Sequence, residues 1–189
     1  MPQTTGQERR EQLKDRYWKR DASWDGTANG WFKGPRTLPL ILALLSQKQL
    51  SAGRDLSRVY LELLARHLDG GVVEMGNEAD HAYAAGYTGG RAVRTWLERM
   101  AVLERLGFIK SKKIGNQHYR LVLLVDPLVA VTQLRKQGHV PEEWWEAYML
   151  RLLETKEATA EKLEDIAEEL SRDKKAPASN RRKAKAGAA

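Results

Sequence analysis

The fold is decided by residues 86–125, which read GYTGGRAVRTWLERMAVLERLGFIKSKKIGNQHYRLVLLV. Apolar residues recur with a helical period over about residues 91–106, and Gly107 directly after them is a helix-ending residue. Residues 108–113 and 118–125 are typical of two strands, and the residues between them suit the turn of a β-hairpin. The sequence therefore predicts a long helix followed at once by a two-stranded hairpin.

Further helices are predicted before this stretch. Residues 37–48 are apolar nearly all round, which is typical of a helix covered on several sides, and Thr37 is its expected N-cap. Residues 55–68 carry one apolar face and end before a pair of glycines. Residues 72–75 suit a short strand, and Asn77 is expected to cap a short helix. The predicted order is helix, helix, strand, short helix, long helix and hairpin.

Length and composition exclude several classes of protein. The chain has 189 residues, enough to bury a core, and it has no cysteine, so disulfides and thiolate zinc sites are excluded. Its charged start is unlike a secretory signal. Its longest apolar stretch, residues 38–45, falls far short of the about 20 residues that a membrane-spanning helix needs. We therefore expect a soluble, cytoplasmic protein.

The net charge of +7 is distributed in blocks. Residues 1–36 carry +3 and residues 37–89 carry −2, whereas residues 90–120 carry +6 from eight basic and two acidic side chains. Residues 121–171 carry −6, and residues 172–189 carry +6. The total charge is therefore no argument for nucleic-acid binding. The coincidence of a basic block with the long helix and the hairpin does favour nucleic-acid binding.

At the residue level this stretch resembles the winged helix-turn-helix superfamily of DNA-binding proteins, as in bacterial repressors of the multiple-antibiotic-resistance type and many plasmid-encoded regulators. The resemblance is carried by the passage from the recognition helix into the first wing strand, Leu103-Glu104-Arg105-Leu106-Gly107-Phe108-Ile109. It implies a mainly α fold with a small β-hairpin wing, in which a winged helix-turn-helix is flanked by further helices. It also implies a prokaryotic or plasmid-encoded transcriptional repressor that binds double-stranded DNA sequence-specifically, in association with the nucleoid. The two glycines of the turn depart from the serine or threonine of many members, and the helix is longer than usual.

The residues themselves favour DNA binding independently of the resemblance. Six apolar residues of the long helix fall on one stripe, which must face a core, namely Val93, Trp96, Leu97, Met100, Leu103 and Leu106. Polar side chains near the start of the helix are then free to enter a major groove, where arginine can donate two hydrogen bonds to guanine. Glycines before the helix let a phosphate approach its positive end, and hairpin lysines suit contact with the DNA backbone or the minor groove.

The candidate DNA-binding residues lie in two groups. The turn and the first half of the long helix contribute Thr88, Gly90, Arg91, Arg94, Thr95 and Glu98. The hairpin contributes Lys110, Lys112, Lys113, Asn116, Gln117 and His118. Two of these residues have an equally strong alternative role, because Glu98 can form an internal ion pair and His118 can pack across the hairpin.

Four regions are expected along the chain. Residues 1–36 form an N-terminal helix and an aromatic loop, and residues 37–139 form the winged-helix DNA-binding domain. Residues 140–171 form one acidic C-terminal helix, whose weak heptad spacing leaves open whether it packs on its own domain or forms a homodimer. Residues 172–189 form a disordered basic tail, which adds non-specific affinity for DNA, folds back on the acidic helix or serves solubility.

Catalytic and metal chemistry have little support in the sequence. The spacing of Glu78 and His81 matches a metal-binding pattern, but no second copy and no further ligand cluster accompany it. Phosphate-binding and nucleophile motifs are absent, so we expect no enzymatic activity, no cofactor, no metal and no small-molecule ligand. Two alternative functions stay open. One is a plasmid replication or partition protein that binds iterated sites, and the other is a winged-helix interaction module that docks through exposed Trp144 and Trp145.

Overall fold

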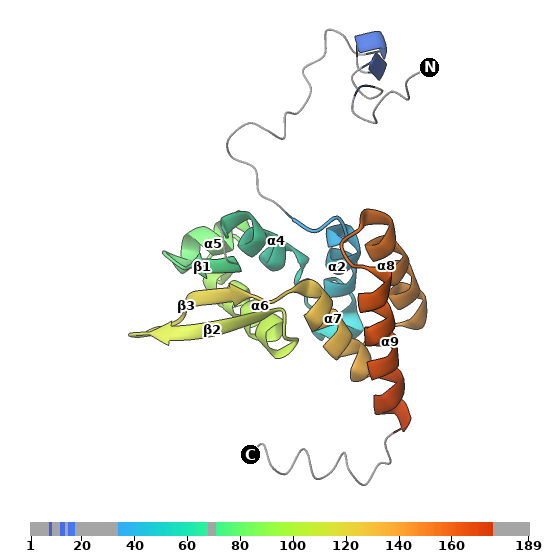
Figure 1. Cartoon of the computed structure of the whole chain (residues 1–189). Helices are drawn as coiled ribbons and strands as arrows, with labels where there is room; N and C mark the ends of the chain where they lie inside the picture. Colours follow the sequence, from blue (N-terminus) through green and yellow to red (C-terminus); the bar gives the residue numbers. More distant parts are fainter. Residues whose placement is uncertain (1–7, 9–11, 14, 18–33, 68–70, 176–189) are drawn as a thin grey trace. The chain divides into compact units, whose positions relative to one another are not determined.

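The computed structural model describes residues 8, 12, 13, 15–17, 34–67 and 71–175 (Figure 1). The chain divides into two compact units, Met1–Trp31 and Phe32–Ala189, and each is considered by itself. The described residues of the first unit are helical, as the sequence predicts for this segment. The predictions for the aromatic loop, apart from its last three residues, and for residues 176–189 of the tail lie outside the described residues.

The second unit is mainly helical and begins with α2 (Leu38–Leu45), α3 (Lys48–Ser51) and α4 (Ser57–Arg66). The single helix expected over residues 37–48 is therefore wrong at its end. The chain leaves the first helix because Gln47 adopts an extended backbone, with φ −68° and ψ 125°. Helix α2 is covered on several sides as expected, and its buried residues reach zero exposure.

Thr37 does not cap α2 with its side chain, which corrects the prediction from the sequence. Its backbone is helical, with φ −81° and ψ −4°, whereas side-chain capping needs an extended residue at this position. Instead its hydroxyl and its backbone N–H donate to the two carboxylate oxygens of Glu157, at 2.8 and 3.0 Å. Thr37 therefore ties the start of α2 to a segment near the other end of the chain.

The middle of the unit contains a small antiparallel sheet and two helices. The elements follow the order β1 (Val72–Glu74), α5 (Glu78–Ala84), α6 (Ala92–Arg105), β2 (Ile109–Ile114) and β3 (Gln117–Leu124). The strand order in the sheet is β1-β3-β2, with both pairs antiparallel. Each of these elements lies within one residue of the bounds that the sequence predicts.

Local signals explain why these elements begin and end where they do. The side chain of Asn77 accepts a hydrogen bond from the Ala79 N–H at 3.1 Å and so caps α5. Gly107 ends α6 with a left-handed backbone, φ +82°, which glycine adopts without strain. Asp126 caps α7 (Pro127–Lys136) by accepting from the Leu128 N–H at 2.8 Å.

The C-terminal part forms two helices, α8 (Glu142–Thr155) and α9 (Ala160–Lys175), and not the single acidic helix expected over residues 140–171. Residues 172–175 belong to α9, so the expectation of disorder from residue 172 onward is wrong for these four residues. The break occurs at Lys156, whose left-handed backbone, φ +58°, ends α8. Figure 1 shows α7, α8 and α9 on one side of the unit, with the sheet and helices α4–α6 on the other. Among the described residues, no helix combines the length and the apolar character needed to cross a membrane.

The tryptophans of α8 belong to the core, so the expected docking patch is wrong. Trp145 is only 8% exposed, because it packs within the core beside Tyr148. Trp144 is half-buried, stacks on Tyr148 with ring centroids 4.9 Å apart, and donates its Nε1–H to the Leu40 carbonyl at 3.1 Å. The aromatic side of α8 therefore packs on its own domain.

Candidate nucleic-acid interface

Helix α6 has one buried and one exposed side. The apolar stripe that the sequence predicts lies in the core, where Trp96, Met100 and Leu103 have zero exposure. Arg91 and Arg94 are exposed on the other side of the helix. The division of the helix into a core face and a polar face is therefore confirmed.

The N-terminus of α6 is open. In the described part of the chain, Arg91 stands at the N-cap without a side-chain hydrogen bond to the helix, and the first turn holds no acidic residue. Thr88, Gly89 and Gly90 before it are all exposed, and a Cβ atom at either glycine would meet no described atom within 4 Å. Because the first N–H groups of a helix carry its positive end, a phosphate can approach closely here.

Glu98 lies between two arginines. It accepts a hydrogen bond from Arg94 Nε at 3.1 Å, and its second oxygen lies 4.0 Å from Arg54 Nε. The internal ion pair that the sequence left open for Glu98 therefore forms. Thr95, the remaining candidate on this helix, is partly buried and offers its carbonyl to Arg99. The sequence reasoning missed Arg54, because it lies between α3 and α4 and no periodicity there indicates a contact with α6.

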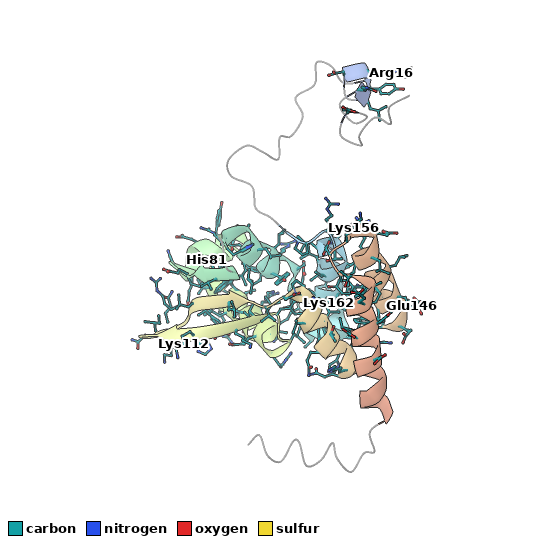
Figure 2. All side chains as sticks on the ribbon, in the orientation of Figure 1. Arg16, His81, Lys112, Glu146, Lys156 and Lys162 are labelled. Atoms are coloured by element: carbon teal, nitrogen blue, oxygen red, sulfur yellow. The ribbon has the colours of Figure 1, made fainter. Side chains whose placement is uncertain are left out.

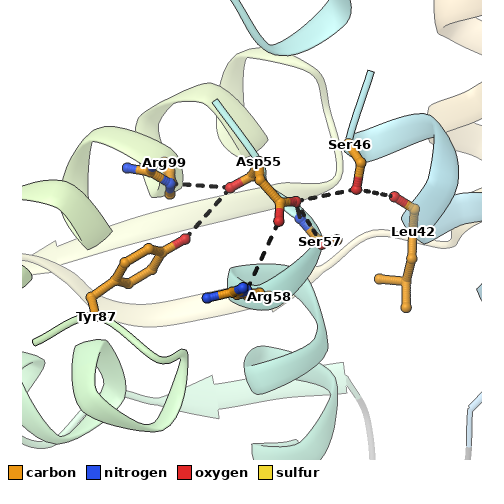
Figure 3. Close-up of polar contacts among 7 residues, drawn as sticks. All are labelled: Leu42, Ser46, Asp55, Ser57, Arg58, Tyr87 and Arg99. Atoms are coloured by element: carbon orange, nitrogen blue, oxygen red, sulfur yellow. Dashed lines mark hydrogen bonds and ion pairs between the residues drawn. The ribbon is translucent and has the colours of Figure 1, made fainter. Parts of the chain in front are cut away.

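Arg99 is held in place by three contacts, and Figure 3 draws the hydrogen bond to Asp55. Its Nε donates to the Asp55 carbonyl at 3.1 Å, and its Nη1 donates to the Thr95 carbonyl at 3.0 Å. Its guanidinium lies 4.8 Å from the centre of the Tyr87 ring, and the Tyr87 hydroxyl donates to the same Asp55 carbonyl at 3.5 Å. Arg99 therefore fixes the turn before α6 against the link before α4.

The carboxylate of Asp55 organises the start of α4. One of its oxygens accepts from the Ser57 N–H at 2.9 Å, from the Ser57 hydroxyl at 2.6 Å and from the Ser46 hydroxyl at 3.2 Å. The other oxygen lies 4.0 Å from Arg58 Nε. Partial burial opposes ionisation, but the bonds from Ser57 and Ser46 and the nearby Arg58 outweigh it and hold the pKa of Asp55 below its ordinary value.

The hairpin presents its lysines to solvent. Lys110, Lys112 and Lys113 are exposed along β2, and Asn116 is exposed at the turn. Figure 2 shows Lys112 on the part of the hairpin that projects from the body of the unit. The exposure expected for these four candidates is therefore confirmed.

The base of the hairpin is tied to the last turn of α6 through Glu104. Its carboxylate accepts from the Ser111 N–H at 3.0 Å and from the Ser111 hydroxyl at 2.6 Å, and it lies 3.7 Å from His118 Nε2. Burial in the first place, and then the Glu104 carboxylate, raise the pKa of Tyr119 to about 12. Since these contacts join strand and helix at several points, the hairpin and α6 form one substructure.

Two hairpin candidates have internal partners. Gln117 donates its side-chain amide to the Gly76 carbonyl at 2.8 Å. His118 packs edge-on against Tyr119, with ring centroids 4.6 Å apart, and the remainder of its ring is exposed. The lysines, Asn116 and the 60% exposed side chain of His118 are therefore the outward-facing part of the hairpin, and both roles of His118 stay open.

His81 is a buried structural residue. It is 4% exposed, its Nδ1 lies 3.1 Å from Glu62 Oε1, and its ring stacks on Trp96 at 5.8 Å. Glu62 also accepts from Arg66 Nε at 2.9 Å. Within the described ranges, no group of three or more potential ligand side chains is arranged to hold a metal ion. His81 therefore packs against the buried face of α6 through its contact with Trp96.

Comparison of the chain with protein-family models, with curated proteins and with solved structures found no match.

Proposed function

We propose that residues 37–139 contain a winged helix-turn-helix domain that binds duplex DNA sequence-specifically. The order of helices and strands supports this, since α5 and α6 are joined by a glycine-containing link and a hairpin follows directly. The observation that carries the proposal is the open N-terminus of α6, with exposed Arg91 and Arg94, on a helix that also holds a lysine-bearing hairpin.

In this proposal the first turns of α6 enter the major groove. Arg91 and Arg94 donate to guanine, and hairpin lysines contact the phosphate backbone. Arg94 must first leave Glu98, but an exposed pair four residues apart on a helix contributes only about 0.3–0.5 kcal/mol. A bidentate contact with guanine contributes about 1–3 kcal/mol of discrimination between bases, so the exchange is favourable.

The biological role that we propose is transcriptional repression in a prokaryotic or plasmid context, on the strength of the resemblance to winged-helix regulators. A homodimer suits this role, because two recognition helices read two half-sites. A replication or partition protein, the alternative role, differs from a dimeric repressor because it binds iterated sites. The interaction-module alternative loses its support, because Trp144 and Trp145 pack within the domain.

Selection of binding sites from a random pool of duplex DNA, with the full chain, tests the proposal. We expect one motif to be enriched, a palindrome for a dimeric repressor and iterated copies for a replication or partition protein. The double variant Arg91→Ala, Arg94→Ala should lose the preference for that motif and keep salt-sensitive binding to any sequence.

The matched control is Arg36→Ala with Arg151→Ala, which removes two exposed charges beside a groove between α2 and α8. This control should keep the wild-type preference. The proposal is wrong if no motif is enriched, or if the Arg91, Arg94 double variant binds the selected site as tightly as the wild type.

A further inference from the structure

Two arginines, half-buried Arg54 and exposed Arg58, lie beside α6 without belonging to it. Arg54 lies in the link before α4 and Arg58 in its first turn, and their side chains are 41% and 64% exposed. Arg54 Nε lies 4.0 Å from Glu98, one turn beyond Arg94 on the exposed side of α6. A Cβ atom on Gly86 would lie 3.3 Å from Arg58 Nη1, so the Arg58 side chain covers the turn that leads into α6.

The backbone that carries both arginines is well fixed. Between them, the Asp55 carbonyl accepts from Arg99 and from Tyr87, and the Asp55 carboxylate accepts from Ser57 (Figure 3). Leu56 is fully buried, and its N–H donates to the Leu45 carbonyl at 3.3 Å. Because the backbone is already ordered in the free protein, binding through these arginines requires ordering of little more than the two side chains.

The charges of the two arginines are only weakly compensated. Each lies 4.0 Å from its carboxylate partner, Glu98 for Arg54 and Asp55 for Arg58. Ion pairs of this kind between exposed groups contribute at most about 1 kcal/mol. A guanidinium offers five N–H donors in a planar arrangement that matches phosphate, so both side chains keep donors for an anion.

We infer that Arg54 and Arg58 form a second phosphate-binding site, which holds the DNA backbone beside α6 on the side opposite the tip of the hairpin. In Figure 1 the chain passes from α2 to α4 near the centre of the unit, whereas the hairpin tip lies at its outer edge. The inference rests on the proposed function and extends it. The bound duplex contacts the protein at three places: the hairpin, α6, and the segment from the α3–α4 link to the first turn of α4.

The test compares binding of the full chain to its selected duplex and to an unrelated duplex over a series of salt concentrations. In Arg54→Gln with Arg58→Gln, affinity for both duplexes should fall by the same factor, about tenfold at low salt. The slope of log affinity against log salt should become shallower by about two, and the preference for the selected site should stay unchanged.

Arg36→Gln with Arg151→Gln removes the same charge from another face and should leave the slope at its wild-type value. Urea unfolding of both double variants establishes that they fold. A further comparison measures the effect of Arg54→Gln on affinity in a Glu98→Gln background. If Arg54 contacts a phosphate, the substitution still lowers affinity there. A role limited to neutralising Glu98 disappears in that background.

The inference is overturned if the wild type binds DNA and the Arg54, Arg58 double variant keeps its salt slope. It is also overturned if the effect of Arg54→Gln vanishes in the Glu98→Gln background, because Arg54 then acts only through Glu98. If the wild type binds no duplex, the proposed function itself fails and this inference fails with it.

Discussion

Helices α6 and α8 are each 14 residues long, and each buries a tryptophan, Trp96 in α6 and Trp145 in α8. Their N-termini differ. Helix α8 begins with Glu142 and Glu143, whose carboxylates stabilise the positive end of the helix. The described first turn of α6 has no acidic residue, and Arg91 stands at its N-cap. Because an acidic first turn repels an added anion, the function that we propose assigns phosphate contact to the end of α6 and not to the end of α8.

The comparison teaches that packing does not distinguish a recognition helix from a structural one. Both helices are amphipathic and contribute to one core, and only their exposed sides differ. On α6 the Arg94 side chain is 81% exposed, whereas on α8 Leu150 is 60% exposed. Figure 2 shows Lys112 of the hairpin and Glu146 of α8 at opposite ends of the unit. An open cap lowers the stability of a helix, and such local costs are typical of binding sites.

The largest effect is expected from the core face that the two helices share. Trp96 has zero exposure and packs between His81 and Tyr119, with ring centroids 5.8 and 6.4 Å away. Trp96→Ala should lower the free energy of unfolding by about 3–5 kcal/mol, measured by urea denaturation. Trp145→Ala should lower it by a similar or somewhat smaller amount. If Trp145→Ala left stability unchanged, α8 would not share the core of α6 and the comparison would break.

The next prediction concerns the difference between the N-termini of α6 and α8. Arg91→Asp places a carboxylate at the positive end of α6 and should raise the free energy of unfolding by about 0.3–1 kcal/mol through its interaction with the helix dipole. The same change should lower DNA affinity more than tenfold, because a carboxylate then occupies the phosphate position and a guanine contact is lost. Calorimetry and DNA titration measure the two quantities separately.

The matched change in α8 is Pro141→Asp, at a position that also lacks a side-chain cap. It should leave DNA affinity at the wild-type value. Opposite signs for stability and binding at Arg91, with no change in binding at Pro141, identify the end of α6 as the contact. Unchanged DNA affinity in Arg91→Asp would contradict that assignment.

Elements with local signals could be predicted from the sequence, and elements that depend on distant contacts could not. Asn77, Gly107 and Asp126 act within their own turn of chain, so the helix ends that they mark are correct. Thr37 is engaged by Glu157, which lies 120 residues away, and no local pattern reveals that partner. Lys156 takes a left-handed conformation that glycine or asparagine usually adopts, which is why the break between α8 and α9 was missed.

The candidate site divides in the same way. Exposure of Arg94 and the hairpin lysines follows from the helical and strand periods, so it could be predicted. The internal partner of Gln117 and the approach of Arg54 to α6 arise where separate segments meet. These contacts became evident only from the folded chain.

A smaller effect concerns the two glutamates in the C-terminal halves of these helices. Glu104 of α6 accepts from Ser111 and holds the hairpin, whereas Glu154 of α8 makes an exposed pair with Arg151 at 3.4 Å. Glu104→Gln should lower the free energy of unfolding by about 1–2 kcal/mol and speed amide exchange at Ser111. Glu154→Gln should stay within about 0.5 kcal/mol of the wild type. Equal effects of the two substitutions would mean that Glu104 does not anchor the hairpin.

The smallest effect is the pH dependence of the ionisation of Tyr119, which interacts with Glu104. Its pKa of about 12 in the folded chain lies above the ordinary value of 10.0. A group with a raised pKa stabilises the fold fully below pH 10, and this contribution is lost as the pH rises through about 12. Tyrosinate absorbance should therefore show one ionisation near pH 12 that Tyr119→Phe removes.

In Glu104→Gln the midpoint of that ionisation should fall but stay above 10, because burial is the larger cause of the shift and Glu104 the smaller. Glu154→Gln should leave it unmoved, since that carboxylate lies on α8. A Tyr119 midpoint at 10 in the wild type would show that the hairpin is not packed against α6. The lysines would then move independently of Arg91 and Arg94, and helix and hairpin could not read one site together.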